Sequence, residues 1–406
     1  MKITKEGFTR FCDLVIEAAF YLTIPAVTFS TSLVEITVST MIGAWVLKNL
    51  VRRDISYMRT LPFVLLLLYA VWAVLSCFNS SFAKESFRGV FKVAEYGMLF
   101  VVTAGMALNA RKILTTLYVM ALSLVITSLN GFYQYFSGID LIRHRELIAD
   151  DYLRRISSSF VHPNDLGAYL LTLLIILLSV LISANRDLRL KIKMLAPAAL
   201  SAVALIMTKS RGAWLSFVSG LFVLGGMISR RLIAVFAAGL IVVFLAMPQT
   251  ARDRVFELSD LKSGTTWERI KLWEGTINMI KVHPVLGFGV NTYSRNFPQY
   301  RPADYPDVRY SHNCYLHMAS EIGIPGAVFF ILFILAVLLR GYRVSRKVDD
   351  KTARSVMVGL LAGVSAFALN AMVDTHLYSV SLAGFFYLLL GFLYALTDHA
   401  RNAEDK

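Results

Sequence analysis

The hydrophobic residues of this chain are grouped in long runs, which short polar and basic segments separate. The runs are close in length to the ~20 residues that a helix needs to cross a hydrocarbon core of ~30 Å. This pattern predicts an all-α polytopic membrane protein with about twelve transmembrane helices. The expected spans are residues 11–31, 34–50, 61–78, 89–108, 112–137, 165–184, 193–208, 211–229, 231–247, 322–340, 355–373 and 378–396.

The composition agrees with this pattern. Of the 406 residues 56% are hydrophobic and 17% are charged, and the mean hydropathy is +0.60. Soluble domains carry about 25% charged residues, so a soluble fold is excluded. Three cysteines are too few for a disulfide scaffold. The net charge of +14 does not imply nucleic acid, because basic residues in a membrane protein first serve orientation and anionic headgroups.

The distribution of basic residues predicts the orientation. With the N-terminus in the cytoplasm, 23 of the 41 lysines and arginines lie in cytoplasmic segments and eight lie in short outer loops. Both ends of the chain are then cytoplasmic. Residues 1–247 form helices one to nine with an outer loop at 138–164, residues 248–320 form one large outer loop, and residues 321–406 form the last three helices and the C-terminus. Six of the seven histidines face outward.

The large outer loop holds the first candidate site residues. Residues 265–282 read as a helix with an apolar stripe of Ile270, Trp273, Ile277 and Ile280. Arg269 lies beside this stripe, where it could reach a headgroup phosphate, although the helix could equally serve only to pack. His312 stands just before the next expected span, where a histidine is well placed as a base, because its ordinary pKa lies near neutrality. A surface histidine taken alone is more often inert.

Polar residues at span ends are further candidates. Arg155 and Asn164 close the loop before the sixth span, Arg211 begins the eighth, and Asp374 lies between the last two. Ionisable groups at the membrane edge are costly and therefore suggest function. The alternatives are that Arg211 snorkels to the interface and that Asp374 is only the counter-ion of an arginine.

Several common catalytic motifs are absent from the sequence. It contains no phosphate-binding loop of the Walker type, no D-x-D, no H-E-x-x-H and no G-x-S-x-G. His312 and His317 are five residues apart, which is the wrong spacing for two metal ligands on one helical face. Outward arginines, histidines and aromatics remain. Because arginine matches phosphate oxygens and stays charged, this set suits an enzyme without metal or cofactor that acts on a diphosphate-linked substrate.

Three segments resemble the O-antigen ligases, within the wider group of bacterial polysaccharide ligases and polymerases. His312-Asn313 followed after nine residues by Gly323-x-x-Gly326 looks like the ligase loop signature. Thr208–Leu215, with Arg211, is similar to the arginine segment at the outer start of a middle span. Arg269-x-x-x-Trp273 followed by 283–289 is similar to the loop helix and turn of the family. The segment from Arg155 to Asn164 also fits the wider group.

The resemblance implies a fold and an activity. Such proteins have a GT-C-like architecture and lie in the bacterial inner membrane. They transfer a glycan from undecaprenyl diphosphate to a sugar hydroxyl of lipid A–core at the periplasmic face, without metal or ATP. His312 would be the catalytic base of an inverting reaction and Arg211 and Arg269 would hold the diphosphate. Arg155, Asn313 and Asp374 would bind substrate.

Three other functions stay open at this point. A Wzy-type polymerase would use the same donor with a second lipid-linked repeat as acceptor. A protein O-oligosaccharyltransferase would need a serine-bearing protein. A transporter of a lipid or an ion would suit twelve spans, but such proteins often show inverted repeats and broken helices, and no convincing repeat is present.

Overall fold

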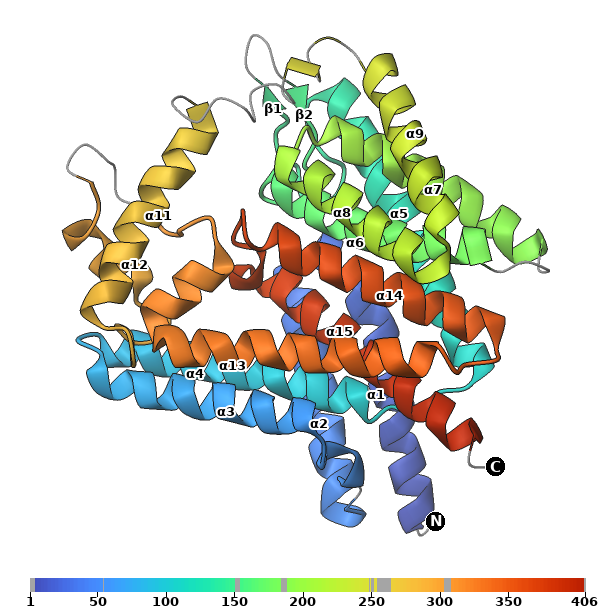
Figure 1. Cartoon of the computed structure of the whole chain (residues 1–406). Coiled ribbons are helices and arrows are strands. Elements are labelled where there is room, and N and C mark those ends of the chain that lie inside the picture. Colours follow the sequence, from blue (N-terminus) through green and yellow to red (C-terminus); the bar gives the residue numbers. More distant parts are fainter. Residues whose placement is uncertain are drawn as a thin grey trace.

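The computed structural model describes residues 4–53, 55–149, 154–183, 188–247, 249, 252–253, 264–302 and 308–404. Each expected span coincides with one long helix (Figure 1). These helices are α1 (Lys5–Phe29), α2 (Thr31–Val51), α3 (Leu61–Ser76), α4 (Ala83–Ala104), α5 (Ala110–Ser137), α6 (Pro163–Ser183), α7 (Leu188–Met207), α8 (Arg211–Ile228), α9 (Arg230–Ala246), α13 (Cys314–Ser345), α14 (Lys351–Asn370) and α15 (Val380–Glu404).

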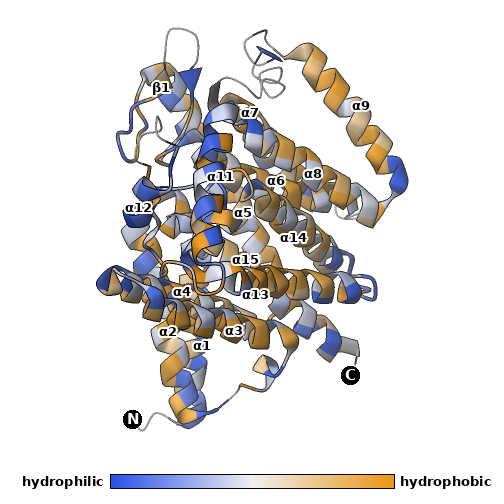
Figure 2. Ribbon diagram, turned by 60° about the vertical axis from the view of Figure 1, so that its left-hand side comes forward, coloured by the Kyte–Doolittle hydropathy of each residue, from blue (hydrophilic) through white to orange (hydrophobic). Residues whose placement is uncertain are grey.

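Ten of these helices are long and apolar enough to cross a membrane, which makes the chain a multi-pass membrane protein. The other two are α4 and α9. Helix α9 has 17 residues, none of them buried, and it lies at the edge of the molecule with an almost continuous apolar surface (Figure 2). Helix α4 carries charged residues along its length, among them Lys92 and Glu95. Twelve spans therefore stay a prediction.

The centre of the molecule is formed by α6, α14 and α15. In the most apolar 18-residue stretch of each of these helices, 78%, 72% and 89% of the residues are buried inside the protein. Helix α14 packs against α6 and α8, while α13 packs against α3. Both chain termini lie on the side away from α11 (Gly264–Val282) (Figure 1). The three cysteines Cys12, Cys77 and Cys314 are free.

Helix α13 begins earlier than the hydropathy predicts. The expected span started at residue 322, but the helix starts at Cys314 because Asn313 caps it with its side chain. Its backbone breaks at Gly323, which has φ 75°. A Cβ at Gly323 would lie 2.0 Å from the Val285 carbonyl oxygen, so only glycine fits there. The turn after α11 is thereby fixed to the break in α13, where Ile324 N donates to Pro284 O at 2.8 Å.

Polar contacts to α5 hold the described residues of the loop at 138–164, which are 138–149 and 154–164. The loop contains a two-stranded antiparallel ladder, β1 (Ile148–Ala149) and β2 (Arg154–Arg155), which the helical pattern did not predict. The Gln134 side-chain oxygen accepts from the backbone N–H groups of Ser157 and Ser158 at 2.9 and 2.8 Å. These contacts, buried within the fold, fix the chain just before α6 begins.

The described part of the large loop contains α11, α12 (Tyr293–Asn296) and a 3₁₀ turn (Phe297–Gln299). The expected helix at 265–282 is confirmed, but the expected stripe is not the buried face. Ile277 is 40% exposed, whereas Leu272, Gly275, Thr276 and Met279 are buried. Small residues are needed on this face, because a Cβ at Gly275 would lie 2.8 Å from the ring of Phe297.

Candidate active site

His312 stands in the short segment that leads into α13. It has φ 50°, a left-handed backbone conformation, and its side chain is 42% exposed. The following residue, Asn313, is 9% exposed, and its Oδ1 accepts from the N–H groups of Tyr315 and Leu316, both at 3.0 Å. Cys314 N donates to Ala371 O at 2.8 Å. These bonds tie the His312 segment to the end of α14.

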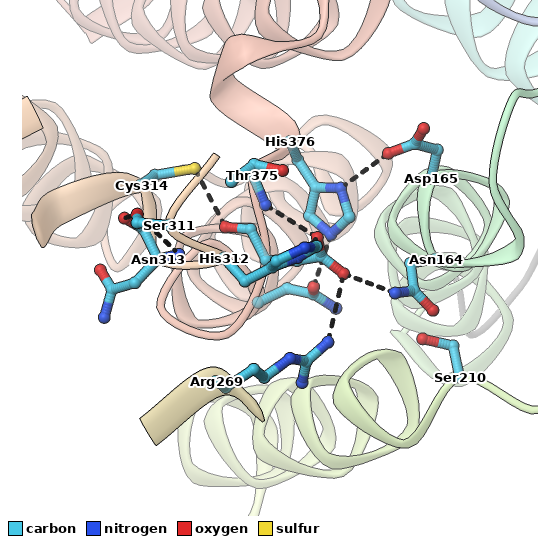
Figure 3. A network of polar contacts seen from close by, with 12 residues as sticks. Asn164, Asp165, Ser210, Arg269, Ser311, His312, Asn313, Cys314, Thr375 and His376 are labelled. Atoms are coloured by element: carbon cyan, nitrogen blue, oxygen red, sulfur yellow. Dashed lines mark hydrogen bonds and ion pairs between the residues drawn. The ribbon is translucent and has the colours of Figure 1, made fainter. Parts of the chain in front are cut away.

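Asp374 is the centre of the polar network, and it lies in the turn between α14 and α15. Figure 3 labels its partners Asn164, Arg269 and His312. Its Oδ1 is 3.2 Å from His312 Nδ1 and accepts from Thr375 N at 2.9 Å. Its Oδ2 accepts from Asn164 Nδ2 at 2.6 Å and lies 3.6 Å from Arg269 Nη2. One carboxylate thus joins residues from α6, α11 and the start of α13.

The electrostatic state of Asp374 follows from these neighbours. Burial raises the pKa of its carboxyl, but the hydrogen bond from His312 and the charges of His376, Arg269 and His312 outweigh burial and hold the pKa well below its ordinary value. The carboxylate is therefore ionised and accepts only. In the 3.2 Å contact His312 Nδ1 is then the donor.

Arg269 reaches this network because of the way α11 packs. Leu272 and Thr276 lie one and two turns farther along the same helix face and are buried. The Thr276 and Tyr293 hydroxyls are 2.9 Å apart. Since this face is held inward, Arg269 at the start of the helix is directed toward Asp374 and keeps 25% of its side chain exposed.

The other two arginines approach from β2 and from the start of α8. Arg155 donates from Nε to Thr208 O at 3.0 Å and from Nη2 to Asn164 Oδ1 at 2.9 Å, so Asn164 links it to Asp374. Arg211 is the first residue of α8 and is 9% exposed. A Cβ on the next residue, Gly212, would lie 3.1 Å from Val373, which places the start of α8 beside the Asp374 turn. A shared clamp of Arg211 and Arg269 stays a prediction.

Two cavities adjoin at this end of the molecule. The first has a volume of about 640 Å³, and its lining includes Arg155, His162, Asn164, His312 and Asp374. The second has a volume of about 510 Å³ and extends between α3, α4 and α13, with Tyr69, Phe91, Tyr96, Phe330 and Tyr387 in its lining. Tyr378 and Val380 line both. The two cavities therefore share part of one wall.

A second histidine, His376, supports the Asp374 turn, and no role was predicted for it. His376 is fully buried; its Nδ1 is 3.1 Å from Asp165 Oδ1 and its Nε2 is 2.7 Å from Asn370 Oδ1. Burial lowers the pKa of His376, but the hydrogen bond to Asp165 and the charges of Asp374 and Asp165 raise it overall. Asn164 was a candidate in the sequence, whereas Asp165 and His376 were not assigned to the site. Their positions next to candidates could have indicated them, because Asp165 follows Asn164 and His376 lies two residues after Asp374.

His317 has the structural role that its spacing suggests. It is 2% exposed, lies 3.4 Å from Glu321 Oε1 and stacks on Tyr293 at 4.2 Å between ring centroids. It is therefore held away from the cavity that His312 lines. Within the described residues, no group of three or more His, Cys, Asp or Glu side chains is placed to hold a metal ion.

The sequence of this chain matches one protein-family profile, described as O-antigen ligase (Wzy_C), over residues 196–331. Residues 196–331 therefore carry an O-antigen ligase domain, and this match supports the family resemblance. The matched segment contains Arg211, Arg269, His312 and Asn313, whereas Arg155 and Asp374 lie outside it.

The remaining comparisons are weaker. One chain of a solved structure described as "Structural coordination of polymerization and crosslinking by a peptidoglycan synthase complex" is similar with 18% identity and a TM-score of 0.45. The similarity covers 83% of this chain and 97% of that one. These values are too low to assign a shared fold or activity. No curated protein matches the sequence.

Proposed function

We propose that this protein is an O-antigen ligase that transfers a polysaccharide from undecaprenyl diphosphate to a sugar hydroxyl of lipid A–core. The reaction takes place at the periplasmic face of the bacterial inner membrane. The observation that carries the proposal is the contact of His312 Nδ1 with Asp374, which also lies 3.6 Å from Arg269, at a cavity of about 640 Å³. The family match supports the donor class.

In this proposal one step forms one bond and breaks one bond. The acceptor hydroxyl oxygen attacks the anomeric carbon of the donor glycan, and His312 Nε2 takes the hydroxyl proton. The bond from the anomeric carbon to the diphosphate oxygen breaks, and the diphosphate leaves with its electron pair. Arg269 and Arg211, with Arg155 behind Asn164, stabilise the charge that develops on it. Direct displacement inverts the anomeric centre.

The shape of the site favours an amphipathic substrate. The cavity at His312 and the cavity at Tyr69 and Phe330 share Tyr378 and Val380, and the second has aromatic side chains in its lining. A lipid-linked diphosphate could keep its charged part at the arginines while isoprenoid units occupy apolar surface. Asp374, in the absence of substrate, serves as the counter-ion of Arg269.

The activity is tested by incubating the purified protein with undecaprenyl diphosphate-linked glycan and lipid A–core, and by measuring the mass of lipid A–core. We expect it to gain the mass of the glycan, and to do so equally in excess EDTA, because Arg155 and Arg309 line the cavity and no group of three or more His, Cys, Asp or Glu side chains among the described residues is placed to hold a metal ion. Loss of transfer in EDTA that magnesium or manganese restores would exclude the metal-free mechanism. A product extended on the undecaprenyl carrier would instead identify a polymerase.

Replacing Arg269 with lysine is expected to lower the transfer rate by roughly 10–100-fold, because a lysine point charge cannot replace the planar, multidentate guanidinium. Initial rates at saturating donor measure this effect. Arg295→Lys is the matched control, since Arg295 lies in the same outer region, is 59% exposed and faces Glu85 at 3.5 Å. Equal rates for the two variants would remove Arg269 from the diphosphate site.

A further inference from the structure

We propose that a groove between α3, α13 and α15, at the end of the helix bundle opposite His312, binds an anionic phospholipid through its phosphate headgroup. The position follows from the length of α15. Val380 lines the His312 cavity and Arg401 lines the groove, and 21 residues at a rise of 1.5 Å each separate them by about 32 Å along this helix. That distance exceeds a hydrocarbon core of ~30 Å. The groove is thus a site separate from the His312 cavity.

The groove has a basic rim. Its volume is about 460 Å³, and the basic residues of its lining are Arg340, Arg343, Lys347 and Arg401. A second cavity of about 530 Å³ adjoins it through Thr60, Arg340 and Arg401. The acidic residue in the lining of the second cavity is Asp398. Four cations from two helices therefore face one space against one carboxylate, an arrangement complementary to phosphate.

One of the four cations is fixed and the others are accessible. Arg340 pairs with Asp398, donates from Nε to Thr397 Oγ1 at 2.8 Å and lies 4.4 Å from the ring centroid of Tyr394. Arg343 and Lys347 are exposed, and neither makes an ion pair with a described side chain. The fixed pair holds α13 against α15 and shapes the groove, while the accessible cations remain for a ligand.

The walls of the groove indicate a lipid in preference to a soluble anion. Leu61 and Leu339 line it and are 63% and 52% exposed. They lie on α3 and α13, which run side by side (Figure 1). Exposed leucines of membrane helices face acyl chains. A ligand with an apolar chain against these leucines and a phosphate at Arg343 and Lys347 satisfies both parts, as basic pockets between membrane helices do for anionic lipids.

Basic residues at helix ends can also serve only to orient the protein in the membrane. The control must therefore distinguish the loss of the groove from the loss of positive charge at this end of the bundle. The groove variant combines Arg343→Gln, Lys347→Gln and Arg401→Gln. The control variant combines Arg230→Gln, Arg231→Gln and Arg346→Gln, which removes the same charge at the same end of the bundle from residues outside the groove lining. Both must keep the wild-type melting temperature in detergent. If the groove triple variant does not, Lys347→Gln alone replaces it.

Binding of phosphatidylglycerol and phosphatidylcholine to the detergent-solubilised protein is measured by native mass spectrometry. We expect saturable phosphatidylglycerol binding that the groove variant weakens about 10–100-fold, because each lysine or arginine near an anionic lipid surface contributes substantially. The control variant should change it less than about twofold. Equal weakening by both variants, equal affinity for phosphatidylcholine, or complete displacement by glycerol phosphate at the same concentration would overturn the proposal. His312→Ala should bind phosphatidylglycerol as wild type does, whether or not it transfers glycan.

Discussion

Replacing His312 with alanine is expected to lower the rate of glycan transfer by about 10²–10⁴-fold, the usual contribution of a positioned base. The acceptor hydroxyl must lose its proton as it attacks, and His312 lines the cavity with its Nδ1 turned to Asp374. Donor binding should persist, because the arginines are unchanged. Single-turnover transfer and equilibrium binding of the lipid-linked donor measure the two effects separately.

The matched control for this prediction is His162→Ala. His162 is exposed and lines the same cavity as His312. Unlike the ring of His312, its ring has no carboxylate partner among the described residues. We expect a loss of less than about tenfold. A His312→Ala enzyme as fast as wild type, or a product that retains the anomeric configuration of the donor, contradicts the one-step mechanism even though the family assignment stands.

The helices could be predicted because each expected span is an apolar run, and burial in lipid or protein selects for that composition. The ends of the helices could not. Asn313 begins α13 in a polar segment that hydropathy assigns to the loop, because capping depends on one side chain bonding to Tyr315 N and Leu316 N. In α11, Ile277 of the expected apolar stripe is exposed. The buried face instead contains Gly275 and Thr276, because a larger side chain at Gly275 would clash with Phe297.

His312, Arg269 and Arg211 could be found from the sequence because each lies in a local motif at a helix boundary. The common partner of His312 and Arg269 could not. The contact of Asn164 with Asp374 spans 210 residues and that of Asp165 with His376 spans 211, so only the packing of α6 against α14 brings them together. Asp374 was a candidate as a counter-ion of an arginine, and the structure gives it Arg269. Its contact with His312 was not foreseen.

Replacing Asp374 with asparagine is expected to lower the transfer rate by about 10²-fold or more, with the fold retained. The amide keeps the shape and can still accept from Thr375 N, but it lacks the charge that holds the Nδ1 proton of His312 and balances Arg269. Loss of the equivalent carboxylate in other His–Asp pairs leaves the ring in the wrong tautomer. Transfer rates and melting temperatures of the purified variant measure activity and folding.

The double variant His312→Ala with Asp374→Asn shows how Asp374 acts. If the carboxylate works through the imidazole, then removing it from an enzyme that already lacks His312 should cost less than about threefold more, because residues that act as a unit are not additive. If Asp374 instead works only by holding Arg269, its loss should multiply with that of His312. In that case pairing Asp374→Asn with Arg269→Lys would give the non-additive result. The contact of 3.2 Å to His312 against 3.6 Å to Arg269 favours the first outcome. If the fold losses in transfer rate of the two single variants multiply in the double variant, Asp374 acts only as the counter-ion of Arg269. His312 then acts without a carboxylate partner.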